Sequence, residues 1–248
     1  MSYSRVRLEI YMQPVSLTFY SSYFLTASYD GQIRAFDYSK KLVSSTLAHS
    51  APITSICVVP TRTDDSTYTI ATSSHDLTCQ ITQINLEMPS SSKALSSLHL
   101  HTAPVSSISS NTTGTHLLTS SWDGLIGLWD TTVPSSDEVP EPTLNERDRK
   151  KRRRTENAAK QKRKAPLLVL KSHTARVSKV LFSSGSEENK AYSCGFDSTV
   201  RRWDTEHGVC EHTIVSLFFF LISPIDLFFF CVERIGKAVS RSSFDLRR

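Results

Sequence analysis

Residues 121–130, SWDGLIGLWD, decide the fold because the same pattern occurs four times along the chain. The other copies are SYDGQIRAFD at 28–37, SHDLTCQITQ at 74–83 and GFDSTVRRWD at 195–204. In every copy an Asp stands six residues before a position that Phe, Thr or Trp occupies. A related phrase opens with a His upstream of the last three copies: HSAPITSI from His49, HTAPVSSI from His101 and HTARVSKV from His173. Positions that recur in register indicate repetition of one supersecondary unit.

The segments between these markers favour β-strands. Apolar residues alternate or run in short β-rich stretches such as ITSICVV and VSKVLF, and no stretch of helical length shows a 3.6-residue period. Asp-Gly at 30–31 and 123–124 favours tight hairpin turns, because both residues tolerate positive φ. We therefore predict an all-β chain with four units of about four strands each. The units span 15–47, 53–100, 105–172 and 177–214.

With these residues the chain resembles a WD-repeat β-propeller, and the resemblance implies one hydrogen-bonded tetrad of His, Ser or Thr, Asp and Trp per blade. One unit matches all four positions, with His101, Ser121, Asp123 and Trp129. A second matches three, with His49, Ser74 and Asp76, and has Thr82 where Trp is expected. A third matches with His173, Asp197 and Trp203, and has Gly195 in place of the Ser. Buried polar groups that are paired in this way stiffen a sheet.

The same side chains also permit a hydrolase interpretation, because Ser, His and Asp can form a nucleophile and its base. Repetition argues against it: a catalytic triad is needed once, whereas a structural tetrad is needed in every blade. The sequence has no GxSxG elbow, HExxH pair or glycine-rich phosphate loop. We therefore predict a protein that is not an enzyme and has no catalytic residues and no cofactor.

Composition supports an intracellular protein with one strongly basic segment. The chain has 248 residues, a formal charge of +5 and 39% hydrophobic residues, enough for a packed core. Residues 147–164 hold 11 Lys and Arg against 2 acids, so the rest of the chain is acidic. Five scattered cysteines without a CxxC pair favour a reducing compartment and argue against disulfides and zinc. The first 14 residues contain no apolar stretch of signal-peptide length.

Residues 131–166 form a polar insertion that changes from acidic to basic and is too poor in large apolar groups to fold alone. Because the apolar stretch at 167–170 resumes directly afterwards, we expect the insertion to be disordered and to join the third and fourth strands of the third unit. Its two basic clusters indicate a nuclear-import or RNA-contact patch, with a merely solvated loop as the alternative. They comprise Lys150, Lys151, Arg152, Arg153 and Arg154, and then Lys160, Lys162, Arg163 and Lys164.

Three phrases narrow the resemblance: the early SYDG, SWDGLIGLWD followed by the insertion, and the stretch at 172–214 that contains GFDSTVRRWD. Together they resemble the eukaryotic ribosome-biogenesis WD-repeat family that assembles with pescadillo-type and Bop-type proteins in the PeBoW, or fungal Nop-seven, complex. The resemblance implies a scaffold in large-subunit precursor particles, required for processing the precursor of the large-subunit and 5.8S RNAs. It also implies nucleolar and nucleoplasmic residence. The alternative is a generic WD-repeat adaptor in ubiquitin ligation or chromatin regulation.

Two departures from this family affect the expectations. Family members begin with a ubiquitin-like domain that engages a midasin-type ATPase, whereas only residues 1–14 precede the first strand here, so we expect that contact to be lost. The family's propeller has seven blades, and only four are recognisable in this sequence. We therefore expect a partial propeller with open ends and marginal stability.

The composition changes abruptly after residue 214. Residues 215–232, VSLFFFLISPIDLFFFCV, contain six of the protein's twelve Phe and approach the length of a membrane span. Pro224 and Asp226 in the middle argue against a span, because a charge is costly in lipid. We interpret 215–248 as retained intron or frame-shifted sequence, with a membrane-bound signalling propeller as the less favoured alternative.

Overall fold

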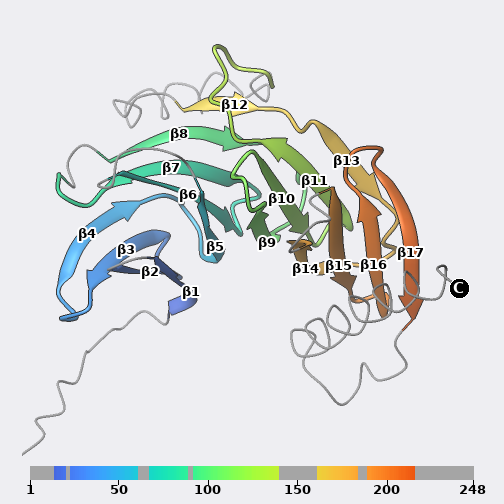
Figure 1. The fold of residues 1–248 in the computed structure, drawn as a ribbon, viewed down its shortest axis with the longest axis horizontal. Coiled ribbons are helices and arrows are strands. Elements are labelled where there is room, and N and C mark those ends of the chain that lie inside the picture. The colour runs from blue at the N-terminus through green and yellow to red at the C-terminus, as the bar shows by residue number, and fades with distance from the viewer. Residues whose placement is uncertain are drawn as a thin grey trace, which may run out of the picture.

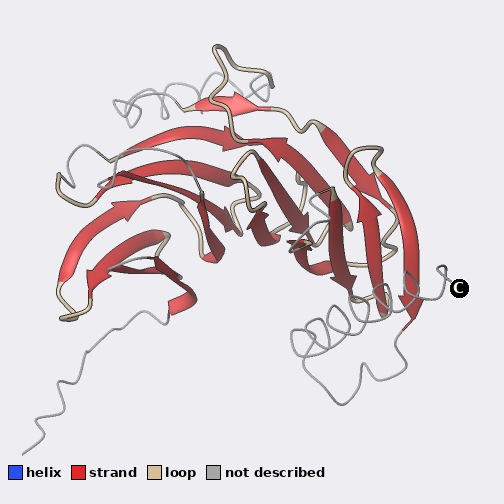
Figure 2. Ribbon diagram, in the orientation of Figure 1, coloured by secondary structure: helices blue, strands red, loops and turns tan. Residues whose placement is uncertain are grey.

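A computed structural model describes residues 14–20, 23–60, 67–88, 92–139, 161–183 and 189–215. In these residues the regular structure consists of strands alone, in four sheets arranged as an arc (Figure 1, Figure 2). The prediction of an all-β, incomplete propeller is confirmed. Each of the four sheets is one blade. No helix in the described ranges is long and apolar enough to cross a membrane.

Each blade contains one of the four sequence repeats. Blade 1 consists of β1 (Pro14–Tyr20), β2 (Tyr23–Ser28), β3 (Gln32–Asp37) and β4 (Leu42–Leu47). Blade 2 consists of β5 (Ile53–Val59), β6 (Thr67–Ser74), β7 (Cys79–Asn85) and β8 (Lys93–Leu98), with β12 (Lys162–Lys164) added at its outer edge. Blade 3 consists of β9 (Val105–Ser110), β10 (His116–Ser121), β11 (Leu125–Asp130) and β13 (Leu168–Lys171). Blade 4 consists of β14 (Val177–Phe182), β15 (Lys190–Gly195), β16 (Thr199–Asp204) and β17 (Val209–Val215).

The blades share one plan, in which consecutive strands pair antiparallel from the inside of the arc to its rim. The inner strands β1, β5, β9 and β14 contact one another in turn along the concave side (Figure 1). Apolar side chains from facing sheets fill the space between neighbouring blades. Ile33 and Ile70 pack between blades 1 and 2, for example, and Leu118 and Val180 between blades 3 and 4. The core therefore lies between the sheets, and each blade depends on its neighbour for burial.

The turn between the second and third strand requires a positive φ in every blade. Gly31 and Gly124 supply it in blades 1 and 3, with φ of 75° and 82°. A Cβ at Gly31 would lie 2.1 Å from the His49 carbonyl oxygen, so this position accepts only glycine. Leu77 and Ser198 hold the same position in blades 2 and 4 with φ of 72° and 60°. Residues other than Gly, Asn and Asp rarely adopt this backbone conformation.

The insertion joins β11 to β13, the third and fourth strands of blade 3, but its basic end is ordered. The expectation of disorder throughout 131–166 was wrong for residues 162–164, which form β12 and pair parallel with β8 of the preceding blade. Backbone hydrogen bonding to an available strand edge orders a segment that lacks apolar groups of its own. Residues 140–160 of the insertion, the N-terminal segment before Pro14 and the tail at 216–248 lie outside the described residues.

Candidate functional site

A buried network ties together the side chains that mark the repeat in blade 3. The carboxylate of Asp123 lies 3.1 Å from His101 Nδ1, and the Thr119 hydroxyl lies 2.9 Å from His101 Nε2. The indole N–H of Trp129, which is fully buried, donates to the same hydroxyl at 3.0 Å. Because an ionised carboxylate only accepts, Nδ1 carries the proton, and neutral Nε2 then accepts from Thr119. A chain of hydrogen bonds therefore runs from the surface turn to the centre of the blade.

The hydroxyl of this network is not the one that the sequence predicted. Ser121 donates to the carbonyl oxygens of Ala103 and Pro104, at 2.9 and 3.0 Å, and accepts from the Asp123 backbone N–H. Ser74 of blade 2 does the same with Ala51, Pro52 and Asp76. Placing Ser121 and Ser74 in the tetrads was therefore wrong. These two serines fasten the loop after the His, whereas the imidazole reaches a residue two positions earlier on the same face of the strand.

Glycine makes room for this arrangement in blade 3. Gly127 stands opposite Thr119 in the β10–β11 pairing. A Cβ at Gly127 would lie 2.8 Å from the indole nitrogen of Trp129 and 2.9 Å from the Thr119 hydroxyl oxygen. The missing side chain therefore opens the space in which these two groups meet.

Blade 4 has a complete network, although the sequence indicated that its hydroxyl was missing. His173 Nδ1 lies 2.8 Å from the Asp197 carboxylate, and Nε2 lies 2.7 Å from the Ser193 hydroxyl. The Trp203 indole N–H donates to that hydroxyl at 2.8 Å. Gly195, which we had aligned with the tetrad serine, instead leaves space for the imidazole, because a Cβ there would lie 2.6 Å from His173 Nδ1.

Blade 2 has the same network without its last member. His49 bonds the Asp76 carboxylate at 2.9 Å and the Thr72 hydroxyl at 3.0 Å. Thr82 replaces the tryptophan, and its buried hydroxyl has no hydrogen-bond partner in the described structure. In the first blade, Asp30 pairs instead with Arg34, which also donates to the Ser28 hydroxyl at 2.7 Å.

Burial and hydrogen bonding shift the ionisation of these groups in opposite directions. Burial alone would raise the pKa of the Asp123 carboxyl, but hydrogen bonds from His101 and from the Leu125 backbone N–H outweigh it and hold the pKa below its ordinary value. The pKa values of Asp76 and Asp197 are lowered by the same balance. Burial lowers the pKa of the His173 ring, and Asp197 offsets only part of that effect. The carboxylates are thus charged and His173 is neutral at pH 7, which is the state the networks need.

The basic residues of the insertion divide into two groups with different surroundings. Lys150, Lys151, Arg152, Arg153, Arg154 and Lys160 lie outside the described residues. Lys162, Arg163 and Lys164 form β12, whose residues pair with Ser96, Ser97 and Leu98. Including Lys164 in the nuclear-import or RNA-contact patch disagrees with the structure, because its side chain is only 2% exposed.

Lys164 is held by the end of the neighbouring blade. Its ammonium lies 2.5 Å from the Asp130 carboxylate and donates to the Thr132 carbonyl oxygen. The two ends of the insertion also bind each other: the Glu138 backbone N–H donates to the Arg163 carbonyl oxygen at 2.8 Å, and Arg163 N–H donates to the Asp137 carboxylate at 2.9 Å. The insertion is therefore clamped at its base, across the rims of blades 2 and 3.

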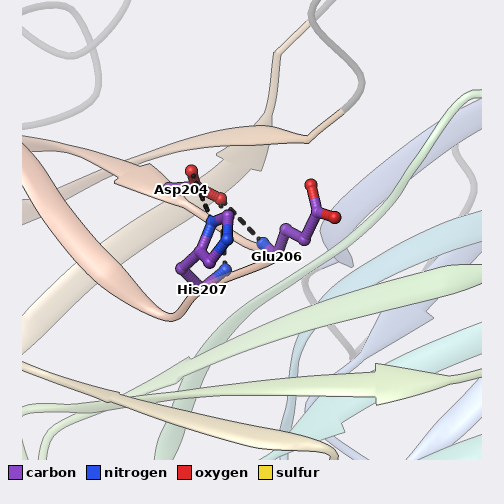
Figure 3. A group of neighbouring side chains, drawn as sticks. All are labelled: Asp204, Glu206 and His207. Carbon is purple, nitrogen blue, oxygen red and sulfur yellow. Dashed lines mark hydrogen bonds and ion pairs between the residues drawn. The ribbon is translucent and has the colours of Figure 1, made fainter.

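The cluster of Asp204, Glu206 and His207 has the composition of a metal site, but its geometry is that of a turn cap (Figure 3). The Asp204 carboxylate accepts from the backbone N–H groups of Glu206 and His207, at 2.9 and 3.2 Å. Lys190 lies 3.1 Å from the same carboxylate and supplies the compensating charge. These bonds use the oxygens that a cation would need, so the cluster serves to close the β16–β17 turn.

Comparison with known proteins supports this architecture. A family model described as "WD domain, G-beta repeat" matches residues 92–130 and 164–204. These two segments of the chain are therefore similar to the WD repeat. These matched ranges contain the two networks in which a tryptophan completes the chain of hydrogen bonds.

The similar WD-repeat proteins point to one subgroup. The chain is 67% identical over 202 residues to "Ribosome biogenesis protein YTM1" of Laccaria bicolor, and 54% identical over 204 residues to the protein of that name in Coprinopsis cinerea. It is 31% identical over 190 residues to "Ribosome biogenesis protein WDR12 homolog" of Arabidopsis thaliana. These matches cover 78%, 78% and 75% of this chain, and 44%, 44% and 42% of the relatives. The chain therefore spans less than half of their length, and the resemblance inferred from the sequence is confirmed.

The sequence analysis missed Thr72, Thr119 and Ser193, which carry the hydroxyl of each network. A signal for them exists in the repeat, because each stands four residues before the recurring turn Asp of its blade. Both that position and the one two residues later carry a hydroxyl in blades 2 and 3, so sequence spacing alone could not choose between them. Blade 4 distinguishes them, since only Ser193 is available there.

Proposed function

We propose that this chain is a non-enzymatic scaffold in the assembly of the large ribosomal subunit, where it contributes to processing of the precursor of the large-subunit and 5.8S RNAs. The observation that carries the proposal is the 67% identity, over 78% of the chain, to a protein named for ribosome biogenesis. The relatives favour this role over a generic adaptor in ubiquitin ligation or chromatin. In the described residues, His, Asp and hydroxyl groups recur as buried networks, which supports a docking platform.

The proposed partners are a Bop-type WD-repeat protein and a pescadillo-type protein within pre-ribosomal particles. Affinity purification of the tagged full chain should recover both proteins together with precursor large-subunit RNA. Depletion of the chain should cause that precursor to accumulate on a northern blot. Recovery of cullin or histone-modifying subunits, with normal RNA processing, would contradict the proposal.

We propose further that the insertion directs the chain to the nucleus through its first basic cluster, residues 150–154. The reason is that part of the second cluster is engaged, with β12 paired to β8 and Lys164 buried against Asp130. Replacing residues 150–154 by alanine should move a fluorescent fusion to the cytoplasm. The matched control replaces Lys162 and Arg163, and should leave the fusion nuclear. Nuclear accumulation of the first variant would overturn this assignment.

A further inference from the structure

In each blade, the residues that face the next blade along the chain stand at fixed positions around the turn Asp. Those positions lie five and three residues before the Asp, and three and five residues after it. In blade 1 they hold Leu25, Ala27, Ile33 and Ala35, which pack against blade 2. Three of the same positions hold Ala71, Cys79 and Ile81 between blades 2 and 3, and Leu118, Ile126 and Leu128 between blades 3 and 4. The register thus marks which face of a sheet the following blade covers.

Blade 4 is the last blade of the described arc, yet its corresponding face is buried (Figure 1). The four positions hold Tyr192, Cys194, Val200 and Arg202. They lie on the side opposite Ala191 and Trp203, which pack toward blade 3. Tyr192 is nevertheless only 4% exposed, and Cys194 and Val200 are each 1% exposed. A sheet face at the end of an arc would be open to water, so other atoms cover this one.

The described parts of the other blades do not supply that cover. Tyr192, Cys194 and Val200 form an apolar cluster of their own, and the apolar side chain packed against it, Leu181, belongs to the same blade. The opposite end of the arc differs. Phe24 and Phe36 point away from blade 2 and stack on each other with centroids 5.1 Å apart, and both remain partly exposed. Complete burial is therefore a property of the blade 4 end.

The chain contains one segment whose composition and position suit this face. Residues 215–232 follow directly from β17, which pairs with β16 of the same blade. They include six Phe and a single charged residue, Asp226. Residues 184–188, in the same blade, read Ser-Gly-Ser-Glu-Glu and offer no apolar group. Since apolar surface is stabilised by leaving water, an apolar segment and an apolar face joined by one chain bury each other at little entropic cost.

We propose that residues 215–232 fold back over the outer face of blade 4 and cover Tyr192, Cys194 and Val200, in the place that a following blade would occupy. The segment thus protects the end of the arc from aggregation and does not serve as a membrane span. Neither the proposed role in ribosome assembly nor the origin of the tail's coding sequence bears on this packing, because the burial of blade 4 alone carries it.

Photocrosslinking in the full chain tests which segment covers the face. Benzoylphenylalanine is placed at Leu181, beside the buried cluster. Mass spectrometry of the irradiated monomer should find crosslinks to peptides from residues 215–232. The matched control carries the same group at Phe24, on the end face of blade 1, and should give no crosslink to that segment.

Thiol labelling measures the protection that the segment provides. The six phenylalanines are replaced by Ser in the full chain: Phe218, Phe219, Phe220, Phe228, Phe229 and Phe230. Labelling of Cys194 by iodoacetamide, followed by peptide mass spectrometry, should accelerate roughly 10-fold or more. Cys79 is equally buried but lies between blades 2 and 3, so its labelling should not change. The control variant Phe244→Ser lies outside the apolar segment and should leave both rates unchanged.

Crosslinks from Leu181 to another segment or to a second copy of the chain would overturn the proposal, as would unchanged labelling of Cys194 in the six-serine variant. Flotation of the unaltered chain with phosphatidylcholine vesicles would assign the tail to a membrane instead. If Cys194 and Cys79 both accelerate, the six-serine variant has unfolded as a whole, and the crosslinks in the otherwise unaltered chain decide.

Discussion

Blades 2 and 3 have the same strand arrangement but differ in how completely their buried polar side chains are hydrogen-bonded. In blade 3, one hydroxyl, that of Thr119, receives the indole N–H of Trp129 and bonds His101. In blade 2, Thr72 bonds His49 alone, and the residue at the tryptophan position, Thr82, buries a hydroxyl without a partner. The comparison teaches that the His–Asp pair with its hydroxyl is common to these two blades and to blade 4, whereas the tryptophan is an additional support.

The largest effect should come from removing the shared hydroxyl in each blade. Thr119→Val leaves both the Trp129 N–H and His101 Nε2 unsatisfied and should lower the free energy of unfolding by roughly 2–4 kcal/mol. Thr72→Val leaves only His49 Nε2 without its partner and should lower the free energy of unfolding by about 1–2 kcal/mol. Urea titrations of the full chain measure both. Thr174→Val, at an exposed position, is the control, and equal losses in the two blades would contradict the comparison.

The next effect concerns the clamp that joins the rims of these two blades. Lys164→Met breaks the buried ion pair with Asp130, and the loss should release β12 from β8. We expect amide hydrogen exchange at His99, whose N–H donates to the Lys164 carbonyl oxygen, to accelerate about 10-fold, which corresponds to about 1.4 kcal/mol of local stability. Lys162 lies on the same strand without an ion pair to another described residue, so Lys162→Met should change exchange little. Unchanged protection in Lys164→Met would show that backbone pairing alone holds the strand.

Acid should destabilise the chain in two stages, the first from His173 of blade 4 and the second from the carboxylates of blades 2, 3 and 4. The pKa of His173 is lowered in the folded chain, so the unfolded chain binds more protons and stability falls as the pH drops below about 6.5. The pKa values of Asp76, Asp123 and Asp197 are lowered as well, and their contribution is lost as the pH falls below about 4. Urea midpoints measured between pH 8 and pH 3.5 check this order. His173→Gln should flatten the first stage only, and a first stage that persists would refute its assignment to His173.

The smallest effect should be a gain of stability in blade 2. Thr82→Val removes the unpartnered hydroxyl while keeping the shape of the side chain, and should raise the free energy of unfolding by about 0.5–1 kcal/mol. The opposite sign is expected for the isosteric change Thr119→Val, whose hydroxyl has two partners. A loss of stability in Thr82→Val would mean that the hydroxyl is satisfied after all.

The site was predictable to different degrees along the chain. His49, His101 and His173 with Asp76, Asp123 and Asp197 could be assigned because their spacing repeats, and the structure brings each pair within hydrogen-bond distance. The hydroxyl could not be assigned, because Thr119 and Ser121 lie two residues apart on one face of β10. Within this blade only the depth that the imidazole reaches distinguishes them, whereas in blade 4 Ser193 is the one hydroxyl at these two positions.

The sequence by itself determined that this protein is made of four-stranded units in series, because each unit contains its own turns, strands and alternating apolar residues. The tertiary structure alone decided the place of β12, which pairs with β8 more than 60 residues earlier in the chain. It also decided the meeting of His75, Trp122 and Arg176 from three blades. The local pattern of turns and apolar residues fixes the strands within one repeat. Contacts between repeats depend on how neighbouring sheets pack, and residue spacing in the sequence does not encode that packing.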